Sequence, residues 1–379
     1  NQPMTVKTSE RFLSLDVFRG LTIALMILVN TPGTGADLYP YLVHAQWFGF
    51  TLADLVFPSF LFAVGNAMSF SMRKFQEAAP ADFWKKVLKR TAIIFLLGFL
   101  MYWFPFFRMN EGHLELSPFS ETRIMGVLQR IALCYFFGAV LVRYFSVKTI
   151  GFICAAILLA YWGILYGFGE PGHELEMATN AAAKFDYAIL GEGHIYKKDA
   201  IPFDPEGILS TLPSIVNVLA GYLAGVFIRR KGKSYETIAK LMLAGFLVFA
   251  LAEWWALIFP LSKKLWTSPF AMLTIGLNLS MLAALIFAVE LKNIKFGTNF
   301  FNVFGKNPLV IYLFSELFYI SLRLIPVNEN QDAFEWVSEE IFQRIFPGSF
   351  GVLMTAIVFM LLCWALGYWM DKKKIYVKI

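Results

Sequence analysis

One of the four histidines in the chain, His44, lies in a segment whose composition suits acid–base chemistry. This segment, about 31–50, contains no Lys or Arg, and aromatic residues such as Tyr41, Trp47 and Phe48 flank the histidine in sequence. Exposed aromatic side chains tend to become buried, so we expect the segment to fold back onto its neighbours. An imidazole held there is suited to act as a general base near neutral pH. The alternative is a polar surface histidine without a chemical role.

Charged side chains inside long apolar blocks form a second set of candidates. Placing such a charge in lipid costs roughly 2.5–3.5 kcal/mol on insertion scales. Arg130 follows Gln129 deep inside an apolar block, where a guanidinium needs a carboxylate, a phosphate or several carbonyls. Two interpretations of Arg130 stay open, a structural ion pair with Asp54 or Glu316 and a contact with a ligand.

Two further basic residues lie close to the ends of apolar blocks. Asp16 and Arg19 are three residues apart, so they share one face of a helix and can pair, or Arg19 can face an anionic ligand. Lys306 and Asn307 directly precede Pro308, which predicts a helix break or a helix start. A lysine beside a helix start suits phosphate, and the alternative is a lysine that extends to the membrane surface.

The elements that must position these residues are about ten apolar blocks of roughly 17–24 residues, each long enough to cross a hydrocarbon core of about 30 Å. Lipid cannot satisfy backbone polar groups, and the blocks lack alternating polarity, so they are predicted to be helices. The chain is predicted to be all-α, a polytopic membrane protein with one domain over residues 1–379. The predicted spans are 15–31, 51–72, 91–107, 124–142, 149–169, 208–228, 241–260, 269–291, 303–324 and 351–370.

The composition agrees with a membrane protein and argues against a nucleic-acid partner. Hydrophobic residues make up 58% of the chain and charged residues 16%, whereas soluble domains carry about 25% charged residues. The net charge of +6 is spread over short clusters between apolar blocks and does not form one patch. Cys134, Cys154 and Cys363 all lie inside apolar blocks, and the sequence has no Cys/His pattern typical of a metal site. We therefore expect buried cysteines and no metal.

The distribution of Lys and Arg predicts the orientation. One set of alternate loops carries most of these residues, with clusters at 85–90 and 229–233. Basic loops are retained in the cytoplasm, so an even number of spans places both termini there. Long loops at about 31–50 and 170–207 are then exported. Residues 331–346 carry an apolar stripe at helical spacing, which predicts a helix lying on the outer membrane surface.

Five blocks of the sequence resemble, in the same order, the heparan-α-glucosaminide N-acetyltransferase family. The blocks are Leu15–Gly20 ending in Val29 and Asn30, His44–Gly49 with Ala53–Pro58, Arg123–Arg130, Asp204–Gly207, and Gly305–Pro308 through Glu316. The resemblance reaches from the first predicted span to the ninth. It implies a transmembrane acyltransferase that takes an acetyl group from cytosolic acetyl-CoA and delivers it across the bilayer to the amino group of a glucosamine-like sugar.

The resemblance also implies roles for individual residues. His44 corresponds to the family's active histidine and Asn30 to its partner, and Asp54 is expected to orient His44 or to bind the sugar. The residues expected to bind the donor are Arg19, Gln129, Arg130, Lys306 and Asn307, with Arg90 and Arg229 as weaker candidates for its phosphates. The residues expected at the acceptor are Trp47, Asp204, Glu206 and Glu316. Asp204 and Glu206 are equally suited to capping the helix that follows them.

Several alternatives stay open from the sequence. The histidine can act as a base, or it can carry the acetyl group itself. The main alternative function is transport of N-acetylglucosamine or another small solute, a label that some bacterial relatives carry. We find no internal repeat of the kind that inverted-repeat transporters show. Segment 31–43 is longer and richer in Pro and Gly than the family resemblance implies, and this departure favours a smaller amino sugar or a cell-envelope saccharide over heparan. The expected location is the bacterial inner (cytoplasmic) membrane, and homo-oligomer formation is left open.

Overall fold

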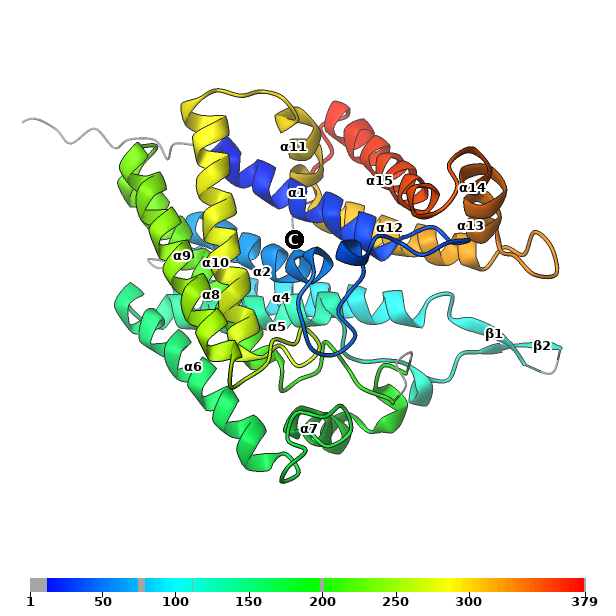
Figure 1. Ribbon diagram of the computed structural model, residues 1–379, viewed down its shortest axis with the longest axis horizontal. Coiled ribbons are helices and arrows are strands. Elements are labelled where there is room, and N and C mark those ends of the chain that lie inside the picture. The colour runs from blue at the N-terminus through cyan, green and yellow to red at the C-terminus, as the bar shows by residue number, and fades with distance from the viewer. Residues whose placement is uncertain (1–11, 74–78, 111, 198–200, 378–379) are drawn as a thin grey trace, which may run out of the picture.

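The computed structural model describes residues 12–73, 79–110, 112–197 and 201–377. Residues 1–11 lie outside this description. They include Lys7 and Arg11, which contribute to the predicted cytoplasmic position of the N-terminus. Within the described ranges the chain is a bundle of helices with one two-stranded hairpin (Figure 1). The predicted all-α, polytopic membrane class is confirmed at this level.

Eight of the described helices are long and apolar enough to cross a membrane, and each coincides with a predicted span. They are α1 (Leu13–Asn30), α2 (Leu52–Ser71), α5 (Val127–Tyr144), α6 (Val147–Phe168), α8 (Thr211–Lys231), α9 (Tyr235–Ala256), α10 (Ser268–Leu285) with its π-helical continuation η4 (Ile286–Leu291), and α15 (Ser349–Lys372).

The other two predicted spans correspond to helices that differ from a simple apolar span. The basic residues at 85–90 and the apolar block after them form one continuous helix, α4 (Pro80–Trp103). The block at 303–324 is divided into α11 (Thr298–Lys306) and α12 (Pro308–Arg323), which has 16 residues. The predicted break before Pro308 is present at Asn307, where φ is −132° and ψ is 53°. A total of ten spans and their orientation stay predictions.

Short elements connect the long helices. They are η1 (Pro40–Leu42), β1 (Phe107–Asn110), β2 (His113–Leu116), η2 (Phe119–Glu121), α7 (Ala181–Leu190), η3 (Glu192–His194), α13 (Ala333–Trp336), the π-helical η5 (Val337–Phe342) and α14 (Gln343–Ile345). The antiparallel hairpin β1–β2 was not predicted. The expected span 91–107 extended too far, because α4 ends at Trp103 and Phe107 already pairs with Leu116. The segment predicted to lie on the membrane surface is helical from Ala333 to Ile345.

Helices α2 and α8 pack together at the centre of the bundle, and both are largely buried. Their close approach depends on glycine. A Cβ atom on Gly65 would lie 1.8 Å from the carbonyl oxygen of Val218, and one on Gly221 would lie 2.0 Å from that of Phe62. Small residues at such crossings are typical of helix packing in membranes. In Figure 1, α6, α9 and α10 lie on one side of this centre, and α11 to α15 lie on the other.

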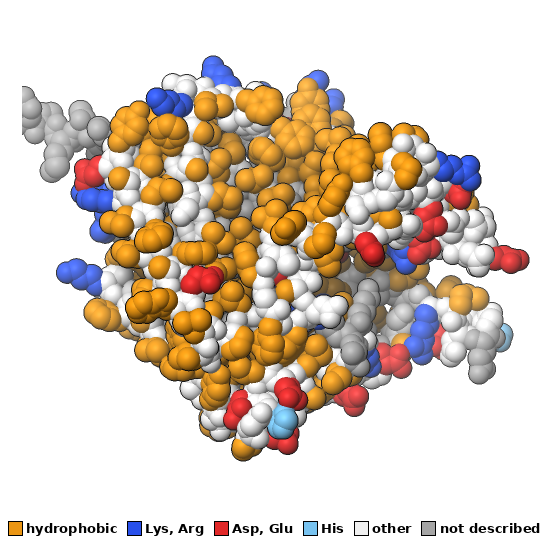
Figure 2. Space-filling model, in the orientation of Figure 1, with side chains coloured by type: hydrophobic (Ala, Val, Ile, Leu, Met, Phe, Trp, Pro, Cys, Tyr) orange, Lys and Arg blue, Asp and Glu red, His pale blue; other side chains and the backbone are white. Residues whose placement is uncertain are grey.

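The molecular surface is divided by side-chain type. On the face shown in Figure 2, a broad apolar band covers the middle of the molecule, Lys and Arg lie at the upper, left and right edges, and Asp and Glu gather mainly at the right and lower edges. Helix α9 contributes exposed Leu243, Phe246, Leu247 and Leu251. A large exposed apolar surface of this kind fits contact with lipid.

Candidate active site between two cavities

Residues from several helix ends and loops meet in a cavity of about 380 Å³, called here the His44 cavity. Its walls combine the end of α1, the start of α2, the loop between α9 and α10, and one face of α12. The polar and charged residues that line it are Asn30, His44, Tyr102, Arg123, Tyr196, Glu206, Lys263, Lys264, Tyr312 and Glu316. Four of the predicted site residues, Asn30, His44, Glu206 and Glu316, therefore share one cavity.

His44 is held by a fully buried carboxylate behind it. Its Nδ1 lies 2.9 Å from Oδ1 of Asp54. The other oxygen of Asp54 accepts hydrogen bonds from the backbone N–H groups of Thr51, at 3.0 Å, and Ala45, at 3.2 Å. An ionised carboxylate only accepts, so Nδ1 of His44 is the nitrogen that carries the proton. This leaves the lone pair on Nε2, as a general base requires.

Sequence reasoning missed Lys263, which contacts the same imidazole from the loop between α9 and α10. Its Nζ lies 3.1 Å from Nε2 and 3.2 Å from Nδ1 of His44. Burial lowers the pKa of Lys263. Burial, followed by the charge of Lys263, lowers the pKa of His44, although Asp54 acts in the opposite direction. The signal available in the sequence was a lysine pair, Lys263 and Lys264, just before an apolar block, and nothing in it indicates a contact 219 positions away.

Asn30 and Glu316 form a second polar pair in the His44 cavity. Asn30 is the last residue of α1, and its Nδ2 donates to Oε1 of Glu316 on α12 at 3.3 Å. Trp47, also predicted at the acceptor, is not among the cavity-lining residues. Its Nε1 donates to the carbonyl oxygen of Leu175 at 2.9 Å, and its ring packs against Phe203. The position of Trp47 thus fixes the loop that carries His44.

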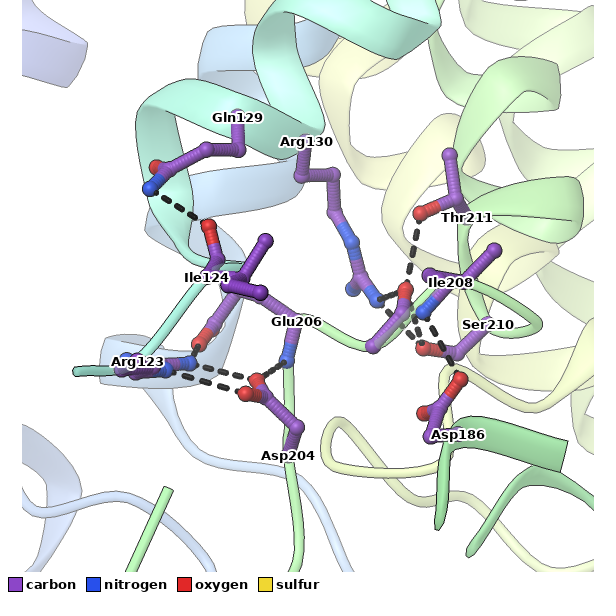
Figure 3. Close-up of polar contacts among 11 residues, drawn as sticks. Arg123, Ile124, Gln129, Arg130, Asp186, Asp204, Glu206, Ile208, Ser210 and Thr211 are labelled. Atoms are coloured by element: carbon purple, nitrogen blue, oxygen red, sulfur yellow. Dashed lines mark hydrogen bonds and ion pairs between the residues drawn. The ribbon is translucent and has the colours of Figure 1, made fainter. Parts of the chain in front are cut away.

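A half-buried arginine, Arg123, connects the segment before α8 to the cavity wall (Figure 3). Arg123 donates to both oxygens of Asp204, at 3.0 and 2.5 Å, and to Glu206 at 2.6 Å. Its guanidinium lies between the rings of Tyr102 and Tyr196, 4.9 and 4.7 Å from their centroids. Burial alone would raise the pKa of Glu206, but positive charge, first that of Arg123, lowers it. Glu206 is therefore an anionic group at the cavity.

Arg130 takes neither of the partners expected for an ion pair. It is fully buried, and its Nη2 donates to the carbonyl oxygen of Gly207, at 3.0 Å, and to the hydroxyl of Ser210. The pairing with Asp54 or Glu316 is thus replaced by contacts to the turn before α8 (Figure 3). Arg130 is not among the lining residues of either cavity described here.

The capping role considered for Asp204 and Glu206 is wrong. Helix α8 begins at Thr211, and the turn that leads into it is held by a different carboxylate. Oδ1 of Asp186 accepts from the N–H groups of Ile208, at 2.9 Å, and Leu209, at 3.3 Å. Burial raises the pKa of Asp186 to about 7.

A second cavity of about 390 Å³, called here the Lys306 cavity, lies at the opposite ends of α1, α2, α4 and α12. Its cationic residues are Arg19, Lys86, Arg90 and Lys306. Arg19 pairs with Asp16 at 2.8 Å, as one interpretation of the sequence expected, and also donates to the carbonyl oxygen of Gly305. The Nε of Arg90 is buried and has no hydrogen-bond partner among the described residues.

The C-terminal residues close one edge of the Lys306 cavity. Lys306 forms an ion pair with Asp371, with Nζ 2.7 and 2.8 Å from its two oxygens. Asn307 donates to the carbonyl oxygen of Ile375 at 2.9 Å and accepts from the N–H of Val377, a lining residue, at 3.0 Å. Asn307 thus holds the C-terminal segment, including the lining residue Val377, at the edge of the cavity. Gln129 is fully buried, does not line the cavity, and donates to the carbonyl oxygen of Ile124.

The two cavities are neighbours inside the bundle and share part of their lining. Met26 of α1 and Tyr312 of α12 line both of them. The cavity residues Arg19 and Asn30 lie eleven positions apart on α1, which corresponds to about 16 Å along the helix axis. Among the described residues, no group of three or more His, Cys, Asp or Glu is arranged to hold a metal ion.

Comparison with known proteins shows the family to which the chain belongs. Residues 11–259 match the family described as "Heparan-alpha-glucosaminide N-acetyltransferase, catalytic". The heparan-alpha-glucosaminide N-acetyltransferases of Homo sapiens and Mus musculus are 27% and 26% identical to the chain. These alignments cover 100% of the chain and 62% of each relative, so the chain spans less than two thirds of their length. The chain belongs to the heparan-alpha-glucosaminide N-acetyltransferase family.

Proposed function

We propose that the chain is a transmembrane acetyltransferase. It moves an acetyl group from acetyl-CoA in the cytoplasm to the amino group of a glucosamine-like sugar on the other side of the membrane. The observation that carries the proposal is the pair of cavities of different character that share Met26 and Tyr312 in their linings. Membership of the family supports the class of reaction.

On this proposal the Lys306 cavity faces the cytoplasm and receives the donor. The positive-inside rule supports this orientation, because the basic clusters of the chain lie at the same helix ends as this cavity. Coenzyme A carries several phosphates, and Arg19, Lys86, Arg90 and Lys306 offer positive charge to them. On this proposal the pantetheine arm extends past Met26 and brings the thioester to His44.

His44 is the base in the proposed reaction. It takes one proton from the ammonium of the sugar through Nε2, and the freed amine attacks the carbonyl carbon of the thioester. The nitrogen–carbon bond forms as the carbon–sulfur bond breaks. The departing thiolate takes the proton from His44, and the second proton on nitrogen passes to water. Asp54 keeps the imidazole in the required tautomer throughout.

The other polar residues of the His44 cavity complete the proposed site. Asn30 is placed to donate an N–H to the carbonyl oxygen while that oxygen carries negative charge. The carboxylates of Glu206 and Glu316 attract the ammonium of the acceptor. A two-step route, in which His44 itself carries the acetyl group, uses the same residues. Trapping acetyl-histidine after a pulse of donor without acceptor would identify that route.

The test is transfer of radiolabel from acetyl-CoA to glucosamine by the purified protein in detergent. We expect labelled N-acetylglucosamine from the unchanged chain and a loss of at least about 100-fold in His44→Ala. His113→Ala is the matched control, because His113 lies exposed on strand β2, and it should keep full activity. Absence of labelled amide from the unchanged chain with every amino sugar tried would refute the proposal.

Transport of N-acetylglucosamine or another small solute is the second candidate, since two neighbouring cavities inside a bundle also suit a solute pathway. It predicts uptake into sealed vesicles that persists without acetyl-CoA, whereas the acetyltransferase requires the donor. The proposed location in a bacterial inner membrane rests on the sequence alone.

A further inference from the structure

The loop that carries Lys263 is fixed by a compact set of hydrogen bonds. The backbone N–H of Ser262 donates to the hydroxyl of Thr267 at 3.1 Å, and the N–H of Thr267 donates to the carbonyl oxygen of Ser262 at 3.1 Å. Trp266 is fully buried at a φ of 52°, a conformation uncommon for a bulky residue. Such backbone strain persists only where the surroundings enforce it, so the position of Lys263 is imposed by the fold.

The same loop is also tied to the segment that carries His44. The N–H of Gly49 donates to the carbonyl oxygen of Leu261 at 2.9 Å. The lysine and the histidine therefore stand on two segments that are hydrogen-bonded to each other. The short distances from Nζ of Lys263 to both ring nitrogens of His44 follow from this connection.

Two adjacent bases take up protons in a defined order. An unperturbed lysine has a pKa of about 10.4 and an unperturbed histidine about 6.5, so the first proton belongs to Lys263. A second proton on His44 would place two positive charges within about 3 Å, and like charges in contact oppose ionisation. The two groups thus titrate as a coupled pair.

The other charged groups around the imidazole do not remove this effect. Asp54 favours the protonated ring, and Glu206 does so from the segment before α8. The remaining charged residues of the cavity are Arg123, Lys264 and Glu316. Burial, the charge of Lys263 and these opposing contributions together still lower the pKa of His44.

We propose that Lys263 is a positioning residue that keeps His44 neutral and able to accept a proton when the medium on its side of the membrane becomes acidic. The proposal rests on the proposed function, because it assigns a base role to His44. Its physical basis is the charge of Lys263, which is retained most fully at low pH, where an ordinary histidine would become protonated. Acetyl transfer then extends to a pH below the usual range of a histidine base.

The first test reads the charge of His44 directly and needs no catalysis. The full chain with ¹⁵N-labelled histidine is titrated by NMR in detergent, and the His44 signal is assigned by its loss in His44→Ala. We expect a midpoint below 6.5 in the unchanged chain, and a midpoint higher by about one pH unit in Lys263→Met. Lys263→Arg keeps the charge and should stay close to the unchanged chain.

Two control variants test whether a change in the His44 midpoint is specific to Lys263. Lys184→Met removes an exposed lysine of α7 and should leave the midpoint unchanged. Asp54→Asn removes the negative partner and should lower the midpoint, opposite to Lys263→Met. If Lys263→Met does not fold, Lys263→Gln takes its place. An unchanged midpoint in the folded Met or Gln variant overturns the proposal.

The second test separates this proposal from the proposed function. In the pH profile of kcat/KM, the acidic limb should move to higher pH in Lys263→Met by the same amount as the NMR midpoint, and it should return in Lys263→Arg. A loss of activity that is equal at all pH values would mean a merely structural lysine and would overturn the proposal. If the unchanged chain transfers no acetyl group, the proposed function fails, while the NMR titration still decides the action of Lys263 on His44.

Discussion

At the scale of single residues, the proposed reaction depends on the protonation states of a few buried or half-buried side chains. Asp54 is fully buried and fixes the tautomer of His44, and Nζ of Lys263 lies 3.2 and 3.1 Å from the two nitrogens of the same ring. Asp186 is a second buried carboxyl group, and it holds the turn before α8. The contact between Lys263 and His44 spans 219 positions of the chain, so it exists only through the tertiary structure.

The buried carboxyl of Asp186 predicts a dependence of stability on pH. Burial raises its pKa to about 7 in the folded chain, against about 3.9 in an unfolded one. Between these values the folded state binds more protons, so the free energy of unfolding decreases as the pH rises from about 4 to 7. Asp186→Asn keeps an acceptor for Ile208 and Leu209 without the charge. We expect its Tm at pH 8 to exceed that of the unchanged chain by at least about 2 °C.

The measurement is thermal unfolding in detergent at pH 5 and pH 8. At pH 5 the two proteins should agree closely, because the wild-type carboxyl is then neutral. Asp37→Asn, which changes an exposed carboxylate, is the control and should follow the unchanged chain at both values. A lower Tm for Asp186→Asn at pH 8 would mean that the ionised carboxylate stabilises the turn.

Residues within one sequence block could be predicted, and residues that meet across the chain could not. Asn30, His44 and Glu316 were found because the family blocks contain them, and they do line one cavity. The ion pair considered for Arg130 is absent, because its Nη2 donates to the carbonyl oxygen of Gly207 and the hydroxyl of Ser210 in a distant turn. Lys263 was missed because its importance comes from a contact 219 positions away, and no periodicity reports such a contact.

At the scale of elements, the site depends on where helices approach closely and where they break. The blocks with the strongest apolar character were predicted as helices, and their predicted bounds lie within six residues of the observed ones. The hairpin β1–β2 was missed because its strands have four residues each and follow directly after a long apolar helix. The break at Asn307 was predicted because proline cannot continue a hydrogen-bonded helix.

The close crossing of α2 and α8 predicts that one added methyl group lowers the thermal stability of the chain. In Gly221→Ala, the new Cβ would lie 2.0 Å from the carbonyl oxygen of Phe62, so the helices must separate. Overpacking of this kind costs about 1–3 kcal/mol, and we expect a Tm lower by several degrees. Gly163→Ala in α6 is the matched control, because nothing lies within 4 Å of its Cβ position. Equal Tm values for the two variants would contradict the described crossing.

The ion pair between Lys306 and Asp371 predicts a change in donor affinity. Asp371 neutralises a cation of the Lys306 cavity, so Asp371→Asn should leave Lys306 available to a phosphate. A partly exposed ion pair contributes about 0.2–1 kcal/mol, and we therefore expect the Kd for coenzyme A to fall by up to about fivefold. Calorimetry in detergent at fixed ionic strength measures this. Asp82→Asn, an exposed residue in the first turn of α4, should leave the Kd unchanged; weaker binding in Asp371→Asn would contradict the assignment.

At the scale of the whole molecule, the bundle places two unlike cavities end to end. One is lined by cations at one set of helix ends, and the other holds an imidazole, an amide and carboxylates at the opposite set. The sequence predicted the all-α class and the two-sided arrangement of charge. It did not predict that Met26 and Tyr312 would border both cavities, because that follows from the packing of α1 against α12.

The most direct measurement of the central claim uses sealed proteoliposomes that contain the chain in a known orientation. Labelled acetyl-CoA is enclosed on the side of the Lys306 cavity, and glucosamine is supplied only on the side of the His44 cavity. We predict labelled N-acetylglucosamine on the glucosamine side, and none when the donor and the acceptor exchange places. Label that appears only when both substrates share one compartment would contradict transfer across the membrane.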